Sequence, residues 1–164
     1  MIVENRAHVA ALATVAGLIV GIQVAVGSHG AESAPQAGGG RQVIRPENYP
    51  YFGLPYSPGI LTGNTLYIAG HLGRDPDTTE LVSGGIEGET RQSLANIREV
   101  LQAAGMEFED VVSVTAYIVD IGEFATFNEV YREYFPEDPP ARATVQVAAL
   151  NVGARVELQM IAVR

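Results

Sequence analysis

Two runs near the C-terminus alternate between polar and apolar residues with a period of two, which is typical of β-strands with one buried face. The first run follows Pro139-Pro140, a pair that cannot sit inside a sheet ladder and therefore marks the start of a strand. One face of this strand carries its polar side chains, Arg142, Thr144 and Gln146. The second run covers residues 156–163, and the turn sequence 151–153 lies between the two runs. The pattern predicts a hairpin that holds Arg142 at the mouth of its first strand.

Earlier segments also have the composition of strands. Gly63-Asn64 separates residues 60–62 from residues 66–69, and two β-type runs joined by such a pair predict a hairpin. The second strand of that hairpin leads into Gly70 and His71. Residues 111–119 are rich in β-branched side chains and predict a buried central strand. A short strand is predicted over residues 42–44, which brings the number of strands to six.

Two segments repeat apolar residues at the spacing of an amphipathic helix. In the first these residues are Leu94, Ile97, Leu101 and Ala104, and Gly105 is a natural stop. The second runs from about residue 121 to 135, with Asp120 as its cap. Its apolar face consists of Phe124, Phe127, Tyr131 and either Tyr134 or Phe135. The predicted order is β-β-β-α-β-α-β-β, an α+β domain.

The N-terminal segment differs from the rest of the chain. Residues 9–26 are almost wholly apolar, so residues 1–27 are interpreted as either a signal peptide or a membrane anchor. Residues 28–41 are rich in Gly, Ser, Ala and Pro and predict a flexible linker. The folded domain is then residues 42–164, and the protein is expected to be exported, with any membrane contact made through the N-terminal segment.

The composition and charge of the chain limit the kinds of catalytic group and partner it can have. The formal net charge is −9, which argues against a nucleic-acid partner, because such binding needs a basic patch. The chain has no Lys and no Cys, which excludes a Schiff-base lysine, a thiol nucleophile and a cysteine zinc site. His71 is the only histidine outside the N-terminal segment. We therefore predict no metal and no organic cofactor, and a chemistry built on Arg, carboxylates, hydroxyls and backbone.

Seven segments in this order resemble the RidA/YjgF family of reactive intermediate (enamine/imine) deaminases. They are Pro55-Tyr56-Ser57, residues 63–67, residues 80–86, residues 90–96, Phe127-Asn128-Glu129-Val130-Tyr131, residues 139–147 and residues 156–162. The resemblance extends from about residue 43 to the C-terminus. It implies a chorismate-mutase-like fold, with one mixed six-stranded sheet covered on one side by two helices, and a homotrimer with sites at subunit interfaces.

The resemblance also implies an activity and a set of site residues. The activity is hydrolysis of small 2-imino or enamine acids to 2-oxo acids and ammonia. Arg142 and Glu157 match the substrate-binding Arg and the water-holding Glu, and a guanidinium suits a carboxylate because it grips both oxygens. The resemblance places Tyr56, Gly70, Asn128 and Thr144 around the substrate. Without it, Tyr56 is by default a packing aromatic, Asn128 a solvent-facing amide, and Arg142 one partner of a surface ion pair.

His71 departs from the family pattern, which has Ser-Gly-Gln where this chain has Ala69-Gly70-His71. A lone histidine at a strand end is more often structural than catalytic. If it lines the site, it hydrogen-bonds to substrate or water and makes activity depend on pH near neutrality. Three functional classes stay open at this point: an imine deaminase, a ligand-binding trimer without turnover, and a chaperone-like scaffold.

The predicted C-terminal hairpin has a geometric consequence for the site. A turn at residues 151–153 places Glu157 beside about Val147, five residues from Arg142. Five residues of strand span about 17 Å, and the odd step puts the two side chains on opposite faces. One chain cannot easily bring Arg142 and Glu157 together, so we expect the site to be shared between subunits.

Overall fold

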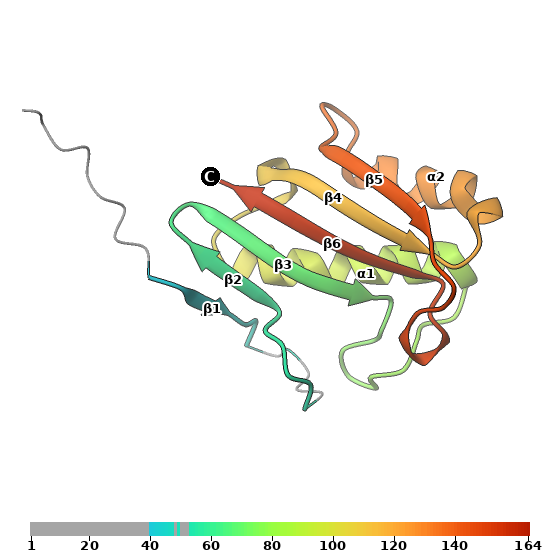
Figure 1. The fold of residues 1–164 in the computed structure, drawn as a ribbon, viewed down its shortest axis with the longest axis horizontal. Helices are drawn as coiled ribbons and strands as arrows, with labels where there is room; N and C mark the ends of the chain where they lie inside the picture. Colours follow the sequence, from blue (N-terminus) through green and yellow to red (C-terminus); the bar gives the residue numbers. More distant parts are fainter. Residues whose placement is uncertain (1–39, 48, 50–52) are drawn as a thin grey trace, which may run out of the picture. The chain divides into compact units, whose positions relative to one another are not determined.

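The fold is one six-stranded sheet with two helices on one of its faces (Figure 1). The computed structural model describes residues 40–47, 49 and 53–164. The strands are β1 (Gln42–Ile44), β2 (Gly59–Thr62), β3 (Thr65–Leu72), β4 (Val111–Ile118), β5 (Ala141–Gln146) and β6 (Val156–Val163). The helices are α1 (Gly85–Ala103) and α2 (Phe124–Tyr134). The predicted fold class and element order are confirmed.

The strand order is β1-β2-β3-β6-β4-β5, and only the β4–β5 pair is parallel. That pair is joined through α2, as a parallel connection requires a crossover. The predicted hairpin between the last two strands is therefore wrong, because β4 lies between β5 and β6. Alternation alone cannot distinguish a hairpin from two strands that pair with a third. The turn itself exists, as a short 3₁₀ segment at Asn151–Gly153.

The core lies between the sheet and the helices. Alternate residues of the central strands point to this side and are fully buried, among them Val114, Ala116, Ile118, Leu158 and Met160. The helices meet them with Leu94, Ile97, Leu101 and Phe127, which are also fully buried. The apolar stripes that predicted the two helices are thus the surfaces that pack on the sheet.

The element boundaries differ from the prediction in two places. Asp120 does cap, accepting a hydrogen bond from the Gly122 N–H, but it caps a 3₁₀ turn, and α2 begins only at Phe124. β3 continues to Leu72, so Gly70 and His71 lie within the strand instead of following it. The pairing of β3 with β6 shifts register between Ile68 and His71, which indicates a β-bulge there. That bulge positions the site described below.

The described residues belong to the compact unit Gln36–Arg164. The predicted signal or anchor over residues 1–27 and nearly all of the linker lie outside the residues that the structure describes. Within the described ranges, no helix is long and apolar enough to cross a membrane.

Candidate active site

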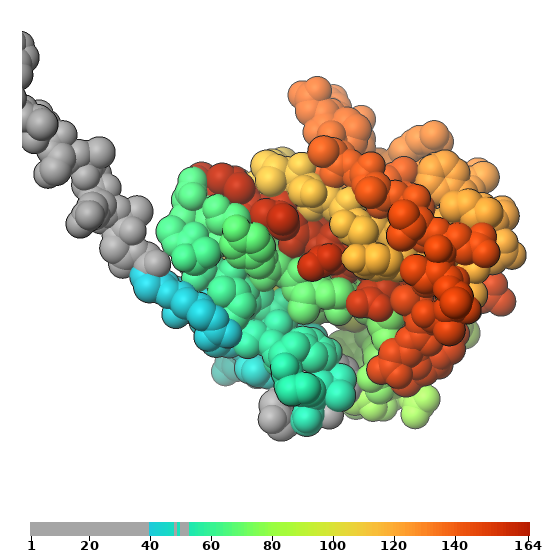
Figure 2. Space-filling model, viewed as in Figure 1, coloured from blue at the N-terminus to red at the C-terminus, as the bar shows by residue number. Residues whose placement is uncertain are grey.

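A cleft of about 610 Å³ opens where β3 and β6 meet the loops around them. Figure 2 shows this hollow between the teal segment after residue 53 and the red segment near residue 150. Four of the seven predicted site residues line it: Tyr56, Gly70, His71 and Glu157. Tyr49 and Asn151, which were not predicted, line it too. The cleft therefore collects the expected site residues of β3, of β6 and of the loop before β2.

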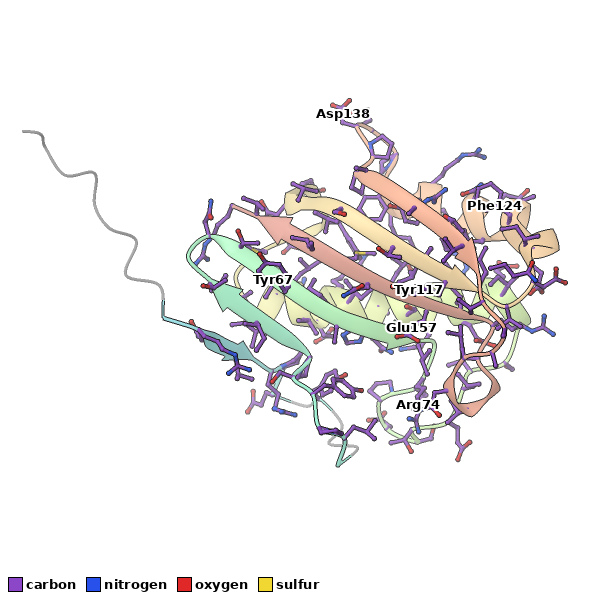
Figure 3. The ribbon with its side chains drawn as sticks, viewed as in Figure 1. Tyr67, Arg74, Tyr117, Phe124, Asp138 and Glu157 are labelled. Atoms are coloured by element: carbon purple, nitrogen blue, oxygen red, sulfur yellow. The ribbon has the colours of Figure 1, made fainter. Side chains whose placement is uncertain are left out.

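Glu157 lies on the face of the sheet that no helix covers, which we call the open face. It pairs with Tyr117 of β4 and with Leu72 of β3. Figure 3 shows Glu157 and Tyr117 together on the viewed face, with Tyr67 farther along it. Among the described residues, none donates a hydrogen bond to the Glu157 carboxylate. The carboxylate is half-buried, and this burial raises its pKa above the ordinary value.

Gly70 provides the space that the Glu157 side chain occupies. A Cβ atom at Gly70 would lie 1.8 Å from Glu157 Oε1 and 2.8 Å from its Cδ. The contact places the carboxylate directly over the bulged backbone of β3. Gly70 is thus needed for close approach, a reason for glycine that does not involve a left-handed backbone.

His71 points toward the helix side of the sheet and is 3% exposed. A ring N–H of His71 donates a hydrogen bond to the Pro58 carbonyl. The ring also meets the Tyr49 ring edge-on, with the two ring centres 5.9 Å apart. Burial lowers the pKa of His71 to about 4, so the imidazole is neutral at physiological pH. Its Nε2 has no hydrogen-bond partner among the described residues. The expectation that His71 makes activity depend on pH near neutrality is therefore not supported.

The other predicted residues form a second group on β5 and α2. The Arg142 guanidinium donates a 2.6 Å hydrogen bond to Asn128 Oδ1. Its Cζ lies 4.3 Å from the centre of the Tyr131 ring and 5.2 Å from that of Phe127. These rings stack on the cation and hold it by cation–π attraction. Burial raises the pKa of the Tyr131 hydroxyl to about 12, and the positive charge of Arg142 opposes that rise.

Among the described residues, no carboxylate pairs with Arg142. Within the part of the chain that the structure describes, the ion pairs are those of Arg91 with Glu87 and Glu133 and of Arg155 with Glu123. The surface ion pair left open for Arg142 is thus absent there. Thr144 shares the helix-side face of β5 with Arg142 and is half-buried. The guanidinium is oriented by an amide and aromatic rings, which do not neutralise its charge. It can therefore pair with an anion from outside the chain.

The two groups are separated by the sheet itself. Glu157 and Val145 both pair with Tyr117 on the open face, so they are level across β4. Arg142 lies three residues from Val145, which is about 10 Å along the strand, and two strand spacings add about 10 Å sideways. The odd step also turns Arg142 to the helix side. The expected separation is confirmed, although the hairpin from which it was predicted does not exist.

Three residues, Tyr49, Asn151 and Tyr131, were not predicted from the sequence as part of the site. Tyr49 lies in an irregular, proline-rich segment, where no periodicity indicates which side chains point inward. Tyr131 was assigned to the apolar face of α2, and it does pack there. Its second role, as a platform for Arg142, depends on the parallel β4–α2–β5 crossover that brings α2 over β5.

Comparison with known proteins decides the family. The sequence profile of the family described as endoribonuclease L-PSP matches residues 47–164. This chain belongs to that family. The family's 2-iminobutanoate/2-iminopropanoate deaminase from Bos taurus is 47% identical over 124 residues, 76% of this chain and 90% of the bovine protein.

Solved structures of family members agree with the fold. RidA from the Antarctic bacterium Psychrobacter sp. is 40% identical, with a TM-score of 0.71 over 75% of this chain and 99% of that protein. E. coli TdcF, solved with bound serine, is 32% identical with a TM-score of 0.71, over 75% of this chain and 98% of that one. The resemblance to the RidA/YjgF family is confirmed.

Gly70→Ala tests the contact between Gly70 and Glu157 in this family member. The new Cβ takes the place of the carboxylate atoms, which are the end of a flexible side chain, so Glu157 must rotate away and we expect a loss of about 0.5–1.5 kcal/mol in the free energy of unfolding. In a Glu157→Ala background the colliding atoms are gone, and the same change should cost less than about 0.5 kcal/mol. Urea unfolding of the four proteins at one protein concentration measures both costs. Equal costs in the two backgrounds would contradict the contact.

Proposed function

We propose that this protein hydrolyses small 2-imino acids, or their enamine tautomers, to 2-oxo acids and ammonia. Suitable substrates are 2-iminobutanoate and 2-aminoacrylate. The observation that carries the proposal is the Glu157 carboxylate, half-buried in the cleft and without a donor among the described residues. The bovine relative, 47% identical, has the name of such a deaminase.

Glu157 suits the role of general base. Hydrolysis adds one water to C2 of the protonated imine, and the C–N bond then breaks. Glu157 accepts a proton from the water as its oxygen bonds to C2 and passes that proton to the amino nitrogen. As the C–N bond breaks, the C2 hydroxyl gives its proton to the departing ammonia and becomes the carbonyl. The products are a 2-oxo acid and an ammonium ion, and the carboxylate returns to its ionised form. The raised pKa of Glu157 makes it a stronger base than an exposed carboxylate.

Arg142 suits the role of carboxylate anchor. Its guanidinium is fixed by Asn128 and lies over Tyr131, so its planar fork has a defined direction. A bidentate pair with the substrate carboxylate places C2 at a set distance from the anchor. Thr144, on the same face, adds a hydroxyl within the same region of β5. Tyr56 and Gly70 border the substrate on the Glu157 side.

We further infer that each site is shared between two copies of the chain, in a homotrimer. Arg142 and Glu157 of one copy are on opposite sides of the sheet, so they do not face one substrate. The open face is apolar enough for contact with another copy, since Tyr67 is 50% exposed and Val145 is 42% exposed. β5 is an edge strand, so its Arg142 is accessible to a neighbour. Threefold symmetry is proposed on the family resemblance.

We also propose export of the domain, supported by the apolar run of residues 9–26. Fractionation of cells that produce the full chain tests this directly. Recovery of the intact chain in the cytosol would overturn it.

Two other functions remain as outcomes of the tests. A trimer that binds ligand without turnover needs Arg142 but not Glu157, and a chaperone-like scaffold needs neither. The family description names an endoribonuclease, but a chain with 19 acidic and 10 basic residues is poorly suited to a polyanion. The deaminase is favoured over these alternatives because it gives a role to both Arg142 and Glu157.

Glu157→Gln distinguishes a deaminase from a protein that binds ligand without turnover. Incubation of the wild-type chain with enzymatically generated 2-iminobutanoate should release 2-oxobutanoate, with activity falling as pH drops through the raised pKa of Glu157. The variant should lose about 10²–10⁴-fold in kcat because the amide cannot accept the proton, while KM changes little. Glu109→Gln, at an exposed glutamate, is the control. Full turnover by Glu157→Gln would show that Glu157 is not the general base.

Arg142→Lys tests the anchor while it keeps the charge. Lysine cannot form the planar bidentate grip, so kcat/KM should fall by about tenfold or more. The matched control is Arg132→Lys on the exposed side of α2, which should behave as wild type. Initial rates over a range of 2-iminobutanoate concentrations measure the effect. Wild-type kinetics in Arg142→Lys would refute the anchoring role.

A further inference from the structure

Glu89 is a buried carboxylate to which the reaction gives no role. It lies in the second turn of α1 and is only 5% exposed. Burial of a charged group is costly unless hydrogen bonds compensate, so such a residue usually has a specific partner. The carboxylate has such a partner in the backbone at the start of β6.

The partner is the peptide group before β6. Glu89 Oε2 accepts a 2.7 Å hydrogen bond from the backbone N–H of Arg155, two residues before Glu157. The Arg155 carbonyl accepts a 3.0 Å hydrogen bond from the Val119 N–H. The backbone at Arg155 is therefore held on one side by α1 and on the other by the residue that follows β4.

Glu89 also contacts the end of β3. A Cβ atom at Gly73 would lie 2.4 Å from Glu89 Cα and 2.5 Å from its carbonyl oxygen. Gly73 directly follows Leu72, which pairs with Glu157. One residue of α1 therefore touches both strand ends that flank Glu157, one through its side chain and one through its backbone.

The register of β6 matters because Glu157 and the core residues alternate along it. Val156 and Leu158 are fully buried on the helix side, while Glu157 is on the open face. A slip of one residue, about 3.3 Å, would turn the carboxylate into the core. β3 already changes register beside this point, so the pairing on that side is irregular. The start of β6 therefore needs an attachment that keeps the register of the strand fixed.

We propose that Glu89 is a positioning residue that anchors the ends of β3 and β6 to α1 and thereby holds the Glu157 carboxylate over Gly70. The proposal rests on the proposed function of Glu157 as general base. Glu89 acts through the backbone, because its carboxylate binds the Arg155 N–H and not the Glu157 side chain. The second link at this point, between Arg155 and Glu123, joins an exposed guanidinium to a partly buried carboxylate through two flexible side chains, so it constrains the backbone less.

Three substitutions of Glu89 in the full chain test the proposal. Glu89→Met removes the acceptor at similar volume, Glu89→Asp keeps the charge but withdraws it by one methylene, and Glu89→Gln keeps an acceptor oxygen. We expect kcat for 2-iminobutanoate to fall about tenfold or more in the Met and Asp variants, with KM within about twofold of wild type. Glu89→Gln should restore kcat to within about threefold.

Two control variants separate positioning from general stability. Thr90→Ala removes a buried hydroxyl that donates a hydrogen bond within α1, to the Ile86 carbonyl, and Glu87→Gln alters an exposed neighbour. Both should keep wild-type kcat, even where Thr90→Ala lowers the Tm. If Thr90→Ala loses as much kcat as Glu89→Asp at equal loss of Tm, Glu89 has only a stabilising role and the proposal is wrong.

A readout without turnover separates this proposal from the proposed function. NMR titration of the Glu side-chain carboxyl groups, with Glu157 assigned by its loss in Glu157→Gln, follows the pKa of Glu157. In Glu89→Asp it should fall toward the ordinary value as the carboxylate moves into solvent, and in Glu89→Gln it should stay raised. An unchanged Glu157 pKa in folded Glu89→Asp overturns the proposal. Absence of turnover by the wild type overturns the deaminase instead, and the titration still decides the role of Glu89.

Discussion

The site depends on one close contact, in which the Glu157 carboxylate lies over the backbone of Gly70. That contact requires β3 to bulge beside β6 and requires a residue without a side chain at the bulge. It also half-buries the carboxylate, which raises its pKa and makes it a better base. The cleft, the pairing of Tyr117 with Glu157 and the buried neighbours of Glu157 on β6 all depend on the same register.

A different part of the fold forms the surroundings of Arg142. The parallel crossover β4–α2–β5 brings Asn128 and Tyr131 over an edge strand, where they orient a guanidinium without neutralising it. The sheet then separates this group from Glu157, because β4 lies between the two strands that carry them. Under the proposed function, Glu157 and Arg142 are thus two halves of a site on opposite faces of the sheet. We propose that association of identical copies brings the two halves together.

Much of this was predictable from the sequence, and the failures have physical causes. Alternation predicted the last two strands, β-type composition and turn residues predicted the earlier ones, and apolar spacing predicted both helices. These patterns do not give the order of strands, so the predicted final hairpin was wrong, while the prediction that Arg142 and Glu157 face opposite sides of the sheet was right. The environment of His71 depends on burial by distant segments, which composition does not encode. Glu89 was overlooked because its partner is a backbone N–H, for which no side-chain motif exists.

The central claim, a site shared between copies, is tested most directly by mixing two inactive variants. Arg142→Ala and Glu157→Ala chains are dissociated reversibly, combined and reassembled, and release of 2-oxobutanoate from 2-iminobutanoate is measured. The account predicts that activity returns in the mixture, because some interfaces then pair an intact Arg142 with an intact Glu157. Each variant taken alone through the same treatment should stay inactive. If mixed assemblies demonstrably form and no activity returns, each chain builds its own site and the account is contradicted.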